Sequence, residues 1–186
     1  SGEVRTFPTV EMVVSDVSNM LDYLLSPARL SPSIERRCIE VAESLATALD
    51  LIGLLAVELF VSKDGQVLIN EIAPRPHNSG HHSIEANATS QFEQHVRAVC
   101  DMPLGDTALK SPAVMVNLVG AEGYQGPVRY EGFNRVLAMP DVFIHLYGKA
   151  ETRPFRKMGH VTIVRSEVNE AIDIAQQIKE EMQVIA

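Results

Sequence analysis

The chain has 186 residues, of which 46% are hydrophobic and 22% charged, and its formal net charge is −8. This composition is typical of a folded protein of one or two domains, and it excludes collagen, a coiled coil and wholesale disorder. The acidic balance argues against broad binding to nucleic acid or membrane surfaces, and two cysteines are too few for a disulfide framework, so we expect a soluble, cytoplasmic protein.

The first part of the chain predicts an edge strand and a helix. Residues 3–14 contain β-branched residues and Pro8, which is compatible with an edge strand interrupted by proline. Ser31 as N-cap and Pro32 at the first helical position begin a helix, and Gly53 stands where a helix-ending glycine belongs. Its apolar positions recur every three or four residues: Ile34, Cys38, Val41, Leu45, Leu49 and Ile52.

Two short apolar runs, residues 56–61 and 67–73, predict a hairpin around Asp64 and Gly65. If these two residues form the centre of the turn, Glu58 lies directly opposite Glu71 on one face. Like charges at that spacing destabilise a sheet unless something lies between them, and carboxylate oxygens favour Mg²⁺ over zinc. The alternative is a solvated face with two unrelated glutamates, because a longer loop or a bulge would change the register.

The loop at residues 74–89 is rich in Pro, His, Asn, Ser and Gly. Arg75 offers a planar fork suited to carboxylate, phosphate or bicarbonate, and His77 and Asn78 follow it. The alternative is that these side chains only satisfy the loop's own backbone. A zinc site at His81 and His82 is disfavoured, because the segment lacks both a helical H-E-x-x-H pattern and a cysteine pair.

A second helix begins with a capping box of Ser90 and Glu93, and Phe92, Val96 and Val99 form its apolar stripe. We place a domain boundary after residue 105.

Beyond that boundary, short apolar runs predict strands at residues 113–119, 142–147 and 160–164. Gly120, Gly123 and Gly126 are interpreted as turns. The chain closes with an amphipathic helix capped by Asn169, whose apolar face comprises Ala171, Ala175, Ile178, Met182 and Ile185.

The segment from Lys149 to Arg165 is basic in an otherwise acidic chain, with five Lys or Arg residues and one acid. Such a cluster can capture a phosphate monoester without attracting polyanions generally. The alternative is a solvated face of a β-rich domain.

The motifs at residues 57–60, 70–81 and 89–95, together with 102–105, 117–120, 147–149 and 156–160, resemble one family. It is the ATP-grasp family of N-carboxyaminoimidazole ribonucleotide synthases of purine biosynthesis, formerly described as the ATPase subunit of phosphoribosylaminoimidazole carboxylase. The resemblance implies an α+β fold in which residues 1–105 form the C-terminal part of an ATP-grasp domain. Residues 106–186 would form a small β-rich domain with a terminal helix.

The resemblance also implies an ATP- and Mg²⁺-dependent ligase that activates bicarbonate as carboxyphosphate and carboxylates 5-aminoimidazole ribonucleotide. In many ATP-grasp relatives an asparagine stands two residues after the second glutamate, whereas here that position holds Ala73, so one metal ligand comes from elsewhere or from water. The roles carried over are metal binding by Glu58 and Glu71, nucleotide contact by Asn70 and Glu71, bicarbonate and aminoimidazole contact by Arg75, His77 and Asn78, and substrate-phosphate binding by Lys149 and Arg156, assisted by Arg153 and Lys157.

The resemblance covers nearly all of this chain but only the C-terminal half of the family's enzyme. We therefore expect the chain to be inactive alone. The resemblance also implies a homodimer, and we expect a separate mutase as partner because the mutase domain fused in some eukaryotic relatives is not found in this sequence. The alternatives are another ATP-grasp ligase, such as a biotin carboxylase relative or a formate-using ribonucleotide transformylase, and a non-catalytic dimerisation or binding module.

Overall fold

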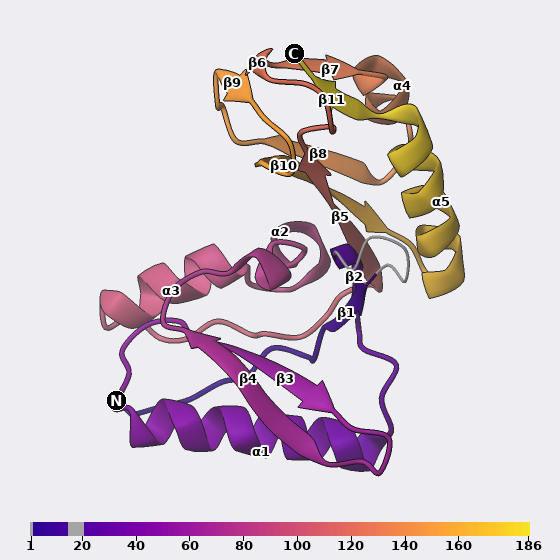
Figure 1. The fold of residues 1–186 in the computed structure, drawn as a ribbon. Helices are drawn as coiled ribbons and strands as arrows, with labels where there is room; N and C mark the ends of the chain where they lie inside the picture. Colours follow the sequence, from indigo (N-terminus) through magenta and orange to yellow (C-terminus); the bar gives the residue numbers. More distant parts are fainter. Residues whose placement is uncertain (1, 15–20) are drawn as a thin grey trace. The chain divides into compact units, whose positions relative to one another are not determined.

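The computed structural model describes residues 2–14 and 21–186, which form two compact units. The first comprises Ser1–Glu11 and Ser26–Lys110, and the second comprises Met12–Leu25 and Ser111–Ala186. Both units mix helices and strands (Figure 1), which confirms the predicted α+β class. The boundary expected after residue 105 lies near the point where the units part, but residues 12–25 join the second unit, not the first.

In the first unit, helix α1 (Pro32–Ala48) packs along the hairpin of β3 (Ala56–Val61) and β4 (Val67–Ala73) (Figure 1). The predicted cap is present, because the Ser31 Oγ accepts a hydrogen bond from the Ile34 N–H at 3.5 Å. Pro32 takes the first helical position, where its missing N–H costs nothing.

The end of α1 differs from the prediction. The left-handed residue that ends the helix is Asp50, with φ 47°, directly after the C-cap residue Leu49. The N–H groups of Asp50 and Leu51 donate to carbonyls of the last turn, which satisfies groups that a helix end leaves open. Gly53 therefore lies beyond the cap, and Ile52 is not part of the helix and is 76% exposed.

The loop after the hairpin is more ordered than predicted. It contains a 3₁₀ turn, η1 (Asn78–Gly80), and a short helix, α2 (Ser83–Ala86), before α3 (Gln91–Val99). The predicted cap of α3 is present, since the Ser90 Oγ accepts from the Glu93 N–H at 3.1 Å.

The apolar stripe of α3 faces outward within the described residues. Phe92, Val96 and Val99 are 41%, 54% and 50% exposed, whereas Gln91 and Gln94 on the other face are 3% and 5% exposed. The helix thus buries amide side chains, which require hydrogen-bond partners.

The second unit contains a five-stranded sheet in the order β1, β2, β5, β10, β8. These strands are Glu11–Val14, Leu21–Ser26, Ala113–Val119, Lys157–Val164 and Val142–Leu146. The edge strand predicted within residues 3–14 is confined to β1, and β2 lies between β1 and β5. This pairing explains why residues 12–25 belong to the second unit.

Helix α5 (Val168–Glu181) covers one face of this sheet (Figure 1). Ala171, Ala175 and Ile178 are fully buried, as the predicted stripe requires. The cap is Glu167, so Asn169 lies inside the first turn. Ile185 lies outside the helix.

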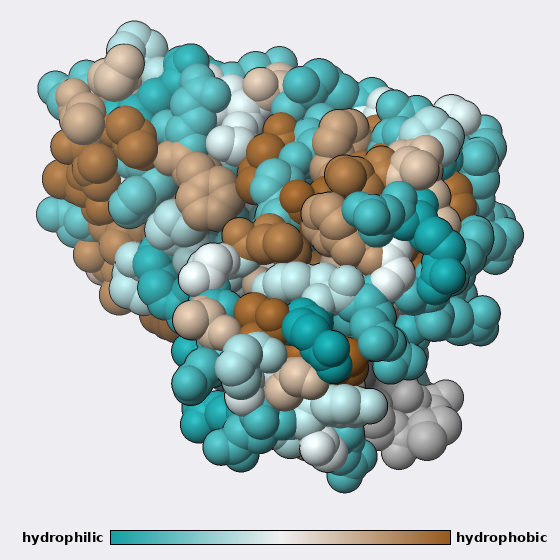
Figure 2. Space-filling model, turned by 90° about the horizontal axis from the view of Figure 1, so that it is seen from above, coloured by the Kyte–Doolittle hydropathy of each residue, from teal (hydrophilic) through white to brown (hydrophobic). Residues whose placement is uncertain are grey.

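Short elements complete the second unit: β6 (Gly126–Pro127) pairs with β9 (Glu151–Thr152), β7 (Arg129–Glu131) pairs with β11 (Gln183–Ile185), and α4 (Phe133–Leu137) follows β7. On the face drawn in Figure 2, apolar residues lie in patches separated by hydrophilic ones. No helix in the described part of the chain is both long and apolar enough to cross a bilayer.

Candidate active site

Glu58 and Glu71 pair directly across β3 and β4, but the register arises differently from the prediction. The loop is longer than a two-residue turn, so the innermost pair is Val61 with Val67. This loop shifts the pairing by one residue at the hairpin's tip. A bulge at Asn70 shifts it back, so the two departures cancel at the glutamates.

The bulge sets two residues of β4, Asn70 and Glu71, against Glu58 of β3. The Asn70 Nδ2 donates to the Glu58 Oε2 at 3.4 Å. An amide and two carboxylates therefore converge at the base of the hairpin, immediately before the loop at residues 74–89.

Glu58, Glu71 and His77 each offer a possible metal-ligand atom, and these atoms lie within 4.8 Å of one another. Two carboxylates this close repel each other unless a cation lies between them. The oxygen donors fit Mg²⁺, which commonly takes one or two carboxylates together with substrate phosphates.

His77 lies beside the carboxylates, its Nε2 3.6 Å from the Glu58 Oε1. Its Nδ1 accepts a hydrogen bond from the Ser79 N–H at 3.4 Å and lies 2.9 Å from the Ser79 Oγ. An Nδ1 that accepts leaves the proton of a neutral ring on Nε2. His77 therefore presents a donor to the carboxylate or to an anionic substrate, which disfavours it as the third metal ligand.

The other two residues expected at the bicarbonate end lie on the same loop. Arg75 is exposed, and its Nη1 donates to the Pro76 carbonyl at 3.0 Å. Asn78 is the first residue of η1. The structure thus brings His77 to the carboxylates and leaves the roles of Arg75 and Asn78 as predictions.

The two histidines weighed for zinc have other partners. The His81 Nδ1 lies 2.8 Å from the Gln91 Nε2, and the His82 Nδ1 lies 3.1 Å from the Ser79 carbonyl. Burial lowers the pKa of His82 from 6.5 to about 4, so this ring is neutral at pH 7.

In the second unit, two of the predicted phosphate-binding cations are held by backbone carbonyls. The Lys149 Nζ donates to the Lys157 carbonyl, and the Arg156 Nη1 donates to the Glu151 carbonyl at 2.9 Å. Arg153 is exposed nearby in sequence. These contacts connect the segment around Lys149 with the beginning of β10.

Three aromatic rings, those of Tyr147, His160 and His145, lie next to Lys149. The quoted sequence motifs include Tyr147 and His160 but gave neither a role. The Lys149 Nζ is 5.6 Å from the Tyr147 ring centre. The Tyr147 hydroxyl is 3.0 Å from the His160 Nδ1, and His160 stacks on His145 with ring centres 4.5 Å apart. His160 is 2% exposed, whereas His145 and Tyr147 are half-buried, so the three rings extend from the buried side of the sheet toward Lys149.

Gly120 is required because the backbone of Arg153 lies close to it, and not because the chain turns there. Its N–H donates to the Arg156 carbonyl at 2.9 Å and its carbonyl accepts from the Phe155 N–H at 2.9 Å. A Cβ at this position would lie 2.1 Å from the Arg153 carbonyl oxygen. The interpretation of Gly120 as a turn was therefore wrong.

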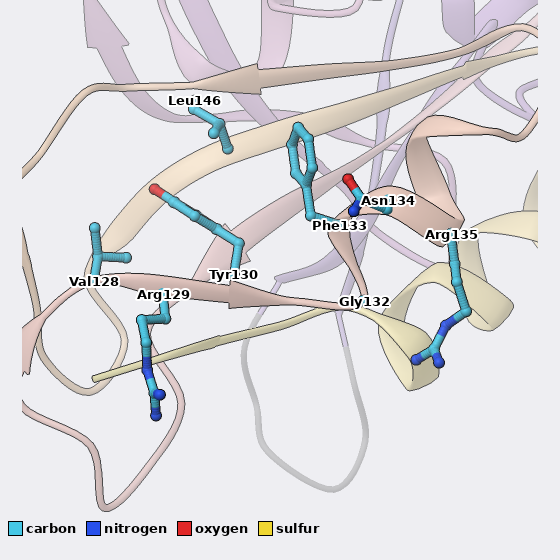
Figure 3. Close-up of a pocket in the computed structure, with 8 residues that line it drawn as sticks. All are labelled: Val128, Arg129, Tyr130, Gly132, Phe133, Asn134, Arg135 and Leu146. Atoms are coloured by element: carbon cyan, nitrogen blue, oxygen red, sulfur yellow. The ribbon is translucent and has the colours of Figure 1, made fainter.

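The second unit also has a hollow of about 590 Å³ that the sequence did not indicate. In Figure 3, Tyr130, Phe133 and Leu146 point toward one another, whereas Arg129 and Arg135 point away. The Arg129 Nη2 donates to the Ala186 carbonyl at 3.2 Å. The side chains that point inward are thus largely apolar, and the two arginines of the lining point outward.

Two family models match the chain. The model described as ATP-grasp domain matches residues 1–92, and the model described as phosphoribosylaminoimidazole carboxylase C-terminal domain matches residues 113–174. Together they account for the parts of the chain that carry the carboxylate pair and the cationic segment.

Relatives agree with these matches. The N5-carboxyaminoimidazole ribonucleotide synthase of Bacillus subtilis (strain 168) is 44% identical over 172 residues, which cover 92% of this chain and 43% of the relative. The phosphoribosylaminoimidazole carboxylase of Schizosaccharomyces pombe is 44% identical over 171 residues, which cover 88% of this chain and 30% of the relative.

Solved structures are similar over nearly the whole chain. The N5-carboxyaminoimidazole ribonucleotide synthetase of Thermotoga maritima matches with a TM-score of 0.89 and 46% identity, covering 97% of this chain and 48% of that one. The Aspergillus clavatus N5-carboxyaminoimidazole synthase in complex with ADP and 5-aminoimidazole ribonucleotide matches with a TM-score of 0.78 and 34% identity, covering 91% of this chain and 47% of that one. The chain spans less than half the length of the curated relatives it matches, and it belongs to the ATP-grasp family of N5-carboxyaminoimidazole ribonucleotide synthases.

Proposed function

We propose that this chain supplies the metal-binding and substrate-phosphate part of an ATP-dependent ligase that carboxylates 5-aminoimidazole ribonucleotide with bicarbonate in purine biosynthesis. The observation that carries the proposal is the opposition of Glu58 and Glu71 at a bulged hairpin, directly before the loop that bears His77. Bicarbonate would attack the γ-phosphorus of ATP, and ADP would leave. The amine would then attack the carboxyl carbon of carboxyphosphate and release phosphate.

Each residue of the hairpin and its loop has a role in this proposal. Glu58 and Glu71 would hold Mg²⁺, which when bound neutralises charge on the nucleotide phosphates. Asn70 would contact the nucleotide beside Glu71. His77, with its proton on Nε2, would donate to bicarbonate, and Arg75 and Asn78 would stabilise the charge that develops on carboxyphosphate.

The cationic segment of the second unit would hold the ribose phosphate of the substrate. Lys149 and Arg156 are already oriented by backbone carbonyls, so little side-chain freedom is lost when a phosphate binds. Arg153 and Lys157 would add to the local positive charge.

Several finer features are part of the same proposal. We infer that residues 1–105 act as the C-terminal part of the ATP-grasp domain and residues 106–186 as the small domain, with β1 and β2 completing its sheet. We also infer a cytoplasmic homodimer whose product passes to a separate mutase. Because the chain spans 43% of its B. subtilis relative, we expect no turnover from it alone.

Reconstitution tests the proposal. The chain is co-expressed with the preceding half of the B. subtilis synthase, and phosphate release from ATP is measured. We expect release that requires both bicarbonate and 5-aminoimidazole ribonucleotide and that falls on the order of 100-fold or more in Glu58→Gln and Glu71→Gln. Glu122→Gln, at an exposed acid of the second unit, is the matched control.

The outcomes separate the alternatives. Phosphate release driven by a different acceptor would indicate another ATP-grasp ligase. A complex that assembles normally but is indifferent to Mg²⁺ and to both glutamate variants would indicate a scaffold and contradict the proposal. Turnover by the isolated chain would contradict its expected inactivity.

A further inference from the structure

Helix α3 buries two glutamines that make the same double hydrogen bond to different peptides. The Gln91 Oε1 accepts from the His77 N–H at 2.9 Å, and the Gln91 Nε2 donates to the His77 carbonyl at 2.8 Å. The Gln94 Oε1 accepts from the Gly105 N–H at 2.8 Å, and its Nε2 donates to the Gly105 carbonyl at 2.9 Å. Both side chains are at least nine-tenths buried.

The Gln91 amide can bind in only one orientation. His77 has an extended backbone, with φ −126° and ψ 152°, and presents its N–H and carbonyl to one amide side chain. Exchanging the oxygen and nitrogen of that amide would oppose donor to donor and acceptor to acceptor. The nitrogen of Gln91 is therefore fixed on the side of the His77 carbonyl.

This orientation determines the state of a second ring. The Gln91 Nε2 also lies 2.8 Å from the His81 Nδ1, and an amide nitrogen can only donate. The His81 Nδ1 must accept, which places the proton of the neutral ring on Nε2. One buried amide thus binds the His77 peptide at both polar groups and selects the tautomer of His81.

We propose that Gln91 is the positioning residue of the loop that carries His77. It acts through the His77 peptide, and the Ser79 contacts at the Nδ1 complete the orientation, so that the Nε2 lies 3.6 Å from the Glu58 Oε1. This inference rests on the proposed role of His77 toward the anionic substrate. Outer contacts of this kind orient reacting groups and are worth about 10- to 100-fold in affinity or activity at metal sites.

The chain contains its own control. Gln94→Leu removes an equivalent buried pair of hydrogen bonds three positions along the same helix. These bonds hold the backbone of Gly105, which has no side chain to contribute to the site. Gln91→Leu and Gln94→Leu should therefore lower the thermal midpoint to a similar extent. The two variants should differ in the imidazole resonances of His77 and His81.

The test records imidazole ¹⁵N resonances and nuclear Overhauser effects of the 186-residue chain at pH 8, without metal. In the wild type and in Gln94→Leu we expect acceptor-type Nδ1 resonances for His77 and His81, and a contact between the His77 ring and the Glu58 side chain. In Gln91→Leu we expect loss of that contact and mixed tautomers.

Gln91→Glu keeps the acceptor and the size of the side chain but removes the donor. A carboxylate next to the His81 Nδ1 should draw a proton onto that nitrogen, so its resonance should change from acceptor to donor type. This variant also tests the inference if Gln91→Leu does not fold. An unchanged His81 resonance in Gln91→Glu, or equal changes in Gln91→Leu and Gln94→Leu, would overturn the inference.

Added Mn²⁺ provides a separate readout of the proposed function. Paramagnetic broadening of Glu58, Glu71 and the His77 ring in the wild type supports the metal site. If no broadening occurs while the tautomer results hold, the metal proposal fails and the positioning role of Gln91 stands.

Discussion

Replacing Glu58 by glutamine should have opposite effects on stability in the absence and presence of a divalent cation. Without metal, the change removes the repulsion between two carboxylates whose ligand atoms lie within 4.8 Å. Glutamine keeps the size of the side chain but only one acceptor oxygen, whereas Asn70 and His77 face different oxygens of Glu58, so one of these two contacts is lost. Both contacts are long, at 3.4 and 3.6 Å, so the loss of one costs less than the repulsion that is relieved. We therefore expect Glu58→Gln to be more stable than the wild type in EDTA.

The magnitude follows from the separation and the exposure of the pair. Two unit charges about 5 Å apart interact by roughly 1 kcal/mol in a water-like dielectric, and by a few times more when buried. Glu71 is exposed, so the lower value applies. For a chain of this length, about 1 kcal/mol corresponds to a rise of roughly 2–4 °C in the thermal midpoint.

The assay is thermal unfolding followed by circular dichroism, in EDTA and in Mg²⁺. A ligand at ten times its dissociation constant stabilises the native state by about 1.4 kcal/mol, so Mg²⁺ should raise the wild-type midpoint and not that of Glu58→Gln. Glu122→Gln should behave as the wild type. A lower midpoint of Glu58→Gln in EDTA, or equal stabilisation of both proteins by Mg²⁺, would refute the reasoning.

Three further predictions concern the second unit and the buried loop. Lys149→Met and Arg156→Met should each weaken binding of 5-aminoimidazole ribonucleotide about 10- to 100-fold in calorimetric titration, because each removes a charge-assisted contact, and unchanged affinity would exclude the assigned phosphate site. Gly120→Ala should cost about 1–3 kcal/mol in urea unfolding, because its Cβ would lie 2.1 Å from the Arg153 carbonyl oxygen, and a neutral effect would argue against that close approach. The free energy of unfolding should fall as the pH drops from 6.5 toward 4, because the unfolded chain protonates His82 while the buried ring, with its pKa lowered to about 4, stays neutral. The loss from this one residue reaches about 3 kcal/mol near pH 4. His82→Asn should lack this part of the pH dependence, and an unchanged pH dependence would contradict the prediction.

The hairpin illustrates how far sequence reasoning reached in the first unit. The two short apolar runs on either side of Asp64 and Gly65 placed both strands at the observed bounds. The assumed turn was wrong, and the pairing of Glu58 with Glu71 was nevertheless correct. Turn length and a bulge at Asn70 depend on hydrogen bonds across strands, which the residue pattern does not encode.

The polar interactions around the site were the least accessible from sequence. Apolar periodicity located α3, but the structure buries the opposite, amide-bearing face. Gln91 contacts a residue fourteen positions earlier, and such a partner cannot be identified by spacing along a helix. Gly120 was misassigned for a related reason, since its constraint comes from a distant carbonyl and not from its own dihedral angles.

The placement of β2 between β1 and β5 limits how the molecule can be divided experimentally. Because β1 and β2 belong to the sheet of the second unit and the chain then returns to the first unit, no single cut separates intact units. A shortened chain that begins at residue 106 would leave one side of β5 without its neighbour, and open strand edges promote self-association. Dissection should therefore retain the segment through Ser26, either by circular permutation or by adding it as a separate peptide.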